Sequence, residues 1–231
     1  MLADGSMVVL VVGMFLVLAR WISKGPPGWR AATVGALAAW LILTAGLATT
    51  GALSDWTARP PRLPLVVLGA VGLGLLVRRT AAFRALLRST PVFWPIGLQV
   101  FRVAVESILF ALHQTGRAPV QVTFEGRNFD ILVGLTAPVV AWSVARGRAS
   151  PWLLLGWNAL GLGVLVNTMA VVATSTPGPL FLWPGAPFTE LLRWPLVWLP
   201  AFLAPLAVML HVASLQQTVS LVRSSPQRTQ S

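Results

Sequence analysis

The chain has 231 residues, of which 56% are hydrophobic and only 10% are charged, and its net charge is +11. Soluble domains carry about a quarter charged residues, so lipid rather than water is the expected solvent for this much apolar sequence. The basic residues stand at the ends of apolar runs instead of along one polar face, which argues against nucleic-acid binding. The absence of Cys excludes disulfides, thiolate metal sites and Cys nucleophiles.

Seven apolar runs follow one another along the chain, and each predicts a transmembrane helix, which needs about 20 apolar residues. They are Ser6–Ile22, Ala31–Leu53, Leu63–Val77, Val92–His113, Asn128–Ala145, Trp152–Ser175 and Pro195–Leu215. The first run lacks the basic start and the small-residue cleavage site of a signal peptide, so we expect it to remain as a helix. The third run is short, and six spans with a re-entrant third segment is the alternative. The predicted fold class is an all-α transmembrane bundle over residues 1–222, followed by a polar tail over 223–231.

The charge distribution predicts the orientation of these helices. Lys and Arg concentrate in the first, third and fifth connections and in the tail, whereas every acid except Glu106 lies toward the opposite side. Cytoplasmic loops are rich in Lys and Arg, so we expect the N-terminus outside and the C-terminus in the cytoplasm. The segment Arg78–Arg88 is interpreted as a positive-inside loop or as a short basic helix on the inner leaflet.

Proline and glycine residues predict where helices break or approach closely. Pro195, Pro200 and Pro205 remove backbone donors from the last span, so we expect that helix to be kinked or broken. Broken helices line transport sites in some proteins and serve packing alone in others. Gly161 and Gly163 are expected to allow close helix packing. No internal repeat is visible, which weakens the case for an inverted-repeat transporter.

A polar stripe in the fourth span is the most informative feature of the sequence. Gln99, Arg102, Glu106 and His113 fall within an arc of about 60° at the helical step of 100° per residue. Charged groups at membrane depth cost several kcal/mol, so this stripe is expected to face the protein interior. Arg102 and Glu106 are i,i+4 neighbours and are expected to pair directly. The stripe is either a buried ligand or ion site or an ion pair that locks helix packing.

Further polar residues are expected near this stripe. In the sixth span, Asn158 and Asn167 lie on opposite helix faces, and Asn167 is preferred because it lies at about the depth of Glu106. The outer connection carries Glu125, Arg127, Asn128 and Asp130 within a few residues. These four side chains are interpreted as a lid over the pocket, or as a local turn in which Asn128 or Asp130 caps the fifth helix.

Three segments resemble a family of bacterial multi-pass membrane proteins. They are FEGRNFDILVGLTAPVVA, which starts at Phe124, VNTM, which starts at Val166, and PLVWLPAFLAPLAVMLHVASLQQ, which starts at Pro195. The resemblance covers roughly residues 100–217. It implies a membrane location and no activity, and we expect that membrane to be the bacterial inner membrane.

Several chemistries are excluded by the residues present. A retinal protein needs a Lys in its last helix, and the last span contains none. His113 and His211 are expected near opposite membrane faces, so they cannot share a metal ion or a haem. An oxygen-rich metal site from Glu106, Glu125 and Asp130 stays conceivable, although no ligand spacing specifies it. The sequence therefore specifies no cofactor.

Three function classes remain. The first is a pocket, opening to the outside, that binds or transports a small molecule or ion, with an anionic or amphipathic ligand suiting the Arg residues. Its predicted binding residues are Arg102, Glu106, His113, Glu125, Arg127, Asn128, Asp130 and Asn167. The second is an intramembrane enzyme with Glu106 or His113 as acid or base. The third is an accessory or assembly subunit whose polar stripe packs against a partner membrane subunit or a second copy of the chain.

Overall fold

The computed structural model describes residues 2–224, and every regular element within that range is helical. The α-helices are α1 (Leu2–Ile22), α2 (Pro27–Thr49), α3 (Arg62–Arg79), α4 (Ala81–Arg88), α5 (Phe93–Leu98), α6 (Phe101–Gln114), α7 (Asp130–Ala145), α8 (Pro151–Ser175) and α9 (Ala204–Ser224). Two short 3₁₀ turns, η1 (Val120–Val122) and η2 (Glu190–Leu192), and a π-helical segment, η3 (Leu199–Leu203), complete the described elements. The all-α fold class is confirmed, and the predicted polar tail lies outside the described residues except for its first two positions, which belong to α9.

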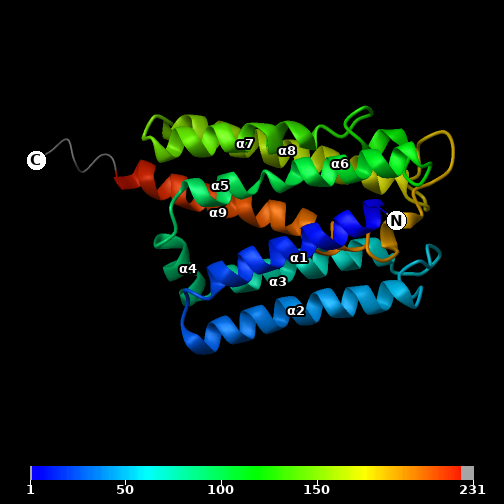
Figure 1. The fold of residues 1–231 in the computed structure, drawn as a ribbon, viewed down its shortest axis with the longest axis horizontal. Coiled ribbons are helices and arrows are strands. Elements are labelled where there is room, and N and C mark those ends of the chain that lie inside the picture. Colours follow the sequence, from blue (N-terminus) through cyan, green and yellow to red (C-terminus); the bar gives the residue numbers. More distant parts are fainter. Residues whose placement is uncertain (1, 225–231) are drawn as a thin grey trace, which may run out of the picture.

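The long helices lie side by side in one bundle, and the start of α1 and the end of α9 lie at its opposite ends (Figure 1). Five helical segments are long and apolar enough to cross a membrane: α1, α2, α5 with α6, α8, and η3 with α9. The number rises to six if α3 and α4 count as one bent span, whereas α7 is shorter. These helices indicate a membrane protein, while the count of seven spans and the orientation stay predictions.

The basic segment after the third span forms a helix of its own. α3 and α4 meet at a bend of 77°, and the Thr80 hydroxyl caps α4 by accepting a hydrogen bond from the Phe83 N–H at 3.2 Å. Leu86 and Leu87 are buried while Arg84 and Arg88 are exposed. The sequence allows either a loop or a short basic helix for this segment, and the structure has a short amphipathic helix.

The last span departs from regular α-helix at Pro200, as its prolines predict, and continues without a gap into α9. Residues Leu199–Leu203 form a π-helical turn, which carries Pro200 and leads directly into α9. Two indoles bind it to α2: Trp40 Nε1 donates to the Ala201 carbonyl at 2.8 Å, and Trp198 Nε1 donates to the Leu41 carbonyl at 3.1 Å. Since a π-turn changes the backbone ladder, these indole donors hold the distorted segment against α2.

The fourth span is also interrupted, between α5 and α6, at Gln99. The Gln99 side chain is buried, and its Nε2 donates to the Ala207 carbonyl of α9 at 3.1 Å. Gln99 therefore bonds the interruption to α9, directly before the polar residues of α6 in the sequence.

Candidate functional site

A buried ion pair joins α6 to the first residue of α7. Arg102 Nε donates to Asp130 Oδ2 at 2.6 Å, and Nη2 donates to the second oxygen of the same carboxylate. The two side chains are 1% and 8% exposed. The predicted Arg102–Glu106 pair is therefore wrong, because both oxygens of the Asp130 carboxylate bind the guanidinium instead. Gly134 lets the helices approach this closely, since a Cβ there would lie 2.8 Å from Val103 Cγ2.

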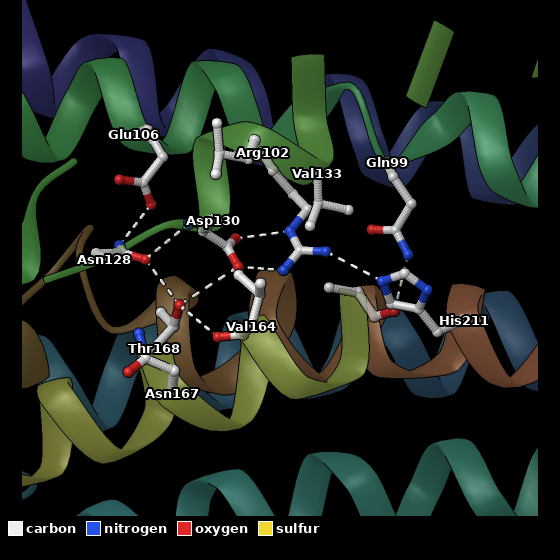
Figure 2. A network of polar contacts seen from close by, with 12 residues as sticks. Gln99, Arg102, Glu106, Asn128, Asp130, Val133, Val164, Asn167, Thr168 and His211 are labelled. Atoms are coloured by element: carbon white, nitrogen blue, oxygen red, sulfur yellow. Dashed lines mark hydrogen bonds and ion pairs between the residues drawn. The ribbon is translucent and has the colours of Figure 1, made fainter. Parts of the chain in front are cut away.

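The same guanidinium also contacts α9. Arg102 Nη1 lies 3.1 Å from His211 Nε2 (Figure 2). His211 Nδ1 lies 3.0 Å from Asn158 Oδ1. Arg can only donate, so Nε2 of His211 accepts while Nδ1–H donates to Asn158. Asn158 Nδ2 then donates to Ser214 Oγ at 2.9 Å. Sequence reasoning missed His211 and Asn158 as members of this network. The one sequence feature that points toward this contact is Gly161, which is expected to allow close helix packing. His211 is the residue that packs there, since a Cβ at Gly161 would lie 2.3 Å from its ring.

Glu106 is reached through Asn128, which uses its whole hydrogen-bonding capacity. Asn128 Nδ2 donates to Glu106 Oε1 at 2.6 Å and to the Val122 carbonyl at 3.0 Å. Its Oδ1 accepts from Thr168 Oγ1 at 2.7 Å and from the N–H of Asp130, the first residue of α7, at 3.2 Å, although the N-cap residue of that helix is Phe129. Glu106 Oε2 is buried and has no hydrogen-bond partner among the described residues.

These polar groups form one side of a cavity of 340 Å³ between α3, α6, α8 and η3–α9. Its polar lining residues are Arg102, Glu106, Asn128, Asp130 and Thr168, and the other lining side chains are apolar. The apolar set is Leu63, Pro64, Val67, Leu68, Phe101, Val105, Leu109, Leu165, Met169, Val172, Ala173, Phe188, Leu191, Leu199, Pro200, Leu203, Ala204 and Ala207. The cavity is thus an apolar chamber with one hydrogen-bonding side. Pro200 of the last span contributes to it, because the π-helical turn forms part of its wall.

Two of the predicted binding residues hold the α6–α7 connection instead of lining the cavity. Arg127 is exposed, and its guanidinium lies 5.3 Å from the centre of the Trp183 ring. Asn167 Nδ2 donates to the Arg127 carbonyl at 2.8 Å. The choice of Asn167 as the pocket residue of α8 is therefore wrong. The next residue, Thr168, lines the cavity, because one step along a helix turns the side chain by about 100°.

His113 and Glu125 also lie away from the cavity. His113 Nδ1 is 3.0 Å from the Ala118 carbonyl, at the end of α6, and Glu125 is exposed. His113 is seven residues from Glu106, which corresponds to about 10 Å of helix rise. Within residues 2–224, no group of three or more His, Asp or Glu side chains is placed to hold a metal ion. The conceivable site from Glu106, Glu125 and Asp130 is therefore not assembled.

A second ion cluster closes the end of the bundle where α1 begins. Arg117 donates to both Asp4 oxygens at 2.9 Å and to Glu190 Oε2 at 3.0 Å. The hydrogen bond with Asp4 raises the pKa of Arg117, so its charge is retained at any ordinary pH. This cluster connects α1, the α6–α7 connection and η2.

Comparisons with protein-family models, with curated proteins and with solved structures found no match for this chain. The resemblance of residues 100–217 to a bacterial membrane-protein family therefore stays an expectation.

Proposed function

We propose that this chain is a multi-pass protein of the bacterial inner membrane that binds an amphipathic molecule in the cavity beside Glu106. The observation that carries the proposal is Glu106 Oε2, a buried carboxyl oxygen on the wall of an apolar chamber that has no hydrogen-bond partner within residues 2–224. A buried polar atom without a partner costs about 1–3 kcal/mol, and a ligand that donates a hydrogen bond removes that cost.

The charges around the cavity favour a particular head group. Arg102 is matched by Asp130 in a two-point ion pair, so it does not call for a second anion. Glu106 accepts a hydrogen bond from the Asn128 amide and forms no ion pair with any other residue that the structure describes. An amine or hydroxyl head group therefore fits better than the anionic ligand that the Arg content of the sequence suggested. The many apolar wall residues require a hydrocarbon portion, which argues against a bare inorganic ion.

The other two function classes receive less support. Of the two residues expected to act as acid or base, His113 contacts the Ala118 carbonyl outside the cavity, so only Glu106 lines it. A polar stripe that packs on a partner helix would have to face outward, yet Arg102 and Glu106 are 1% and 0% exposed within this single chain. Ligand binding, with transport as an extension of it, is the function that this site supports best.

The test compares the binding of three amphiphiles that share a twelve-carbon chain and differ in head group: dodecylamine, dodecanol and dodecanoate. A photoreactive dodecylamine is crosslinked to the protein in phosphatidylcholine nanodiscs, and each unlabelled probe competes. We expect dodecylamine and dodecanol to compete and dodecanoate to compete poorly. Glu106→Gln keeps an oxygen for Asn128 but replaces Oε2 with a donor. It should weaken dodecylamine about ten- to hundredfold, the worth of a charge-assisted hydrogen bond.

Glu125→Gln is the matched control, because it removes an exposed carboxylate outside the cavity and should leave the dodecylamine affinity unchanged. Equal binding of dodecylamine by the wild type and Glu106→Gln would show that Glu106 does not hold the head group. Labelled peptides that lie outside the cavity walls would contradict the proposed location.

A further inference from the structure

The cavity has a gap in its wall on the side of the bundle. α3 and α8 both pack on α9 rather than mainly on each other. On α3, Pro64 is exposed and Leu68 is 66% exposed, although both line the cavity. On α8, Met169 and Val172 line the cavity and are half-buried. The interior is therefore continuous with the apolar outer surface between these two helices.

The nearby end of the bundle is covered. Phe188 and Leu191, from the connection between α8 and η3, line the cavity and are 1% and 2% exposed. The Phe188 N–H donates to the Ser175 carbonyl at 2.7 Å, which fixes this connection to the end of α8. Arg117 holds the neighbouring η2 turn through Glu190. The cavity is thus closed toward the end where water would meet the bundle.

The depth of Glu106 agrees with a route from the side. Glu106 precedes the last residue of α6, Gln114, by eight residues, which is about 12 Å of helix rise. A polar head group at this depth has left the membrane surface and needs a hydrogen-bond partner in the protein. Glu106 Oε2 supplies one.

We infer that the cavity opens laterally to the bilayer between α3 and α8, and that its ligand is a membrane-dissolved single-chain amphiphile with an amine or hydroxyl head group. This inference rests on the proposed function and adds the source of the ligand. A water-soluble solute has no path past Phe188 and Leu191, whereas a lipid-dissolved molecule passes between Leu68 and Met169 without leaving an apolar environment.

The Cys-free sequence makes a direct test practical, since one introduced Cys is the only labelling site. A nitroxide is attached to Met169→Cys in phosphatidylcholine nanodiscs, and its collisions with oxygen and with a water-soluble nickel chelate are measured. We expect collisions with oxygen, none with the nickel chelate, and a loss of oxygen collisions when dodecylamine is added. Leu160→Cys, on the exposed face of α8 outside the cavity, should collide with oxygen to the same extent with and without dodecylamine.

A second pair of variants tests the entry route between α3 and α8 independently of head-group binding at Glu106. Leu68→Trp places a large ring at the gap, whereas Leu65→Trp changes another exposed α3 residue that does not line the cavity. Only Leu68→Trp should slow photolabelling by the dodecylamine probe. Collisions of the Met169→Cys label with the nickel chelate, or with neither reagent, would overturn the lateral route even if Glu106→Gln abolishes binding. Absence of dodecylamine binding by the wild type would instead remove the proposed function.

Discussion

Replacing Gly161 with Ala tests whether the buried polar network depends on one close contact between α8 and α9. A Cβ at Gly161 would lie 2.3 Å from Cε1 and 2.5 Å from Nε2 of His211. No side chain can occupy that space, so the His211 ring must move. That movement breaks its contacts with Arg102 at 3.1 Å and with Asn158 at 3.0 Å.

The size of the effect follows from three contributions. Overpacking in a filled core costs about 1–3 kcal/mol. Two lost hydrogen bonds cost about another 1–3 kcal/mol, and the better helix propensity of Ala returns about 1 kcal/mol. We expect Gly161→Ala to lower the free energy of unfolding by about 1–5 kcal/mol, measured by SDS titration from mixed micelles with Trp fluorescence.

Gly163→Ala is the matched control, because no atom lies within 4 Å of a Cβ at that position. It should be neutral or stabilising by up to about 1 kcal/mol. Adding His211→Ala to Gly161→Ala should remove part of the penalty, since the clash disappears with the ring. Equal stability of Gly161→Ala and Gly163→Ala would refute the reasoning.

Two further predictions use the same unfolding assay. Asp130→Asn leaves the buried Arg102 charge unmatched and should cost about 3–5 kcal/mol, whereas Arg102→Met combined with Asp130→Asn should recover most of that loss. Strictly additive losses in the double variant would contradict the ion pair. Trp40→Phe removes the donor to the Ala201 carbonyl in the π-helical turn and should cost about 1 kcal/mol, whereas Trp152→Phe, at a 75% exposed position, should have no effect. Equal losses from both Trp variants would show that the indole bond does not hold the turn.

The helical architecture and the inward-facing stripe could be predicted because both depend on local properties of the chain. Run length and hydropathy specify helices, and the cost of a charge in hydrocarbon specifies that Arg102 and Glu106 face the interior. Both side chains are buried. The distortion of the last span at Pro200 is confirmed for the same reason, since a missing N–H is a property of the residue itself.

The partners within the site could not be predicted, because they depend on how the helices cross. The sequence offers Glu106 as the neighbour of Arg102, but the approach of α7 at Gly134 brings in Asp130, which is 28 residues away. His211 is 109 residues from Arg102, and no local pattern links the two. Similarly, the rotation of α8 about its own axis places Thr168 rather than Asn167 on the cavity wall.

The shortness of α7 has a consequence for the surrounding lipid. Its 16 residues span about 24 Å, against about 30 Å for the hydrocarbon of an average bilayer. Leu132, Leu135 and Val139 are exposed along it, and Arg146 lies over the Trp142 ring at its far end. If α7 crosses the bilayer, as the sequence predicts, this short apolar face with an anchored end would compress the adjacent bilayer, at a fraction of a kcal/mol for each ångström of mismatch. The molecule should therefore gather short-chain lipids along α7 and partition into thinner membrane regions.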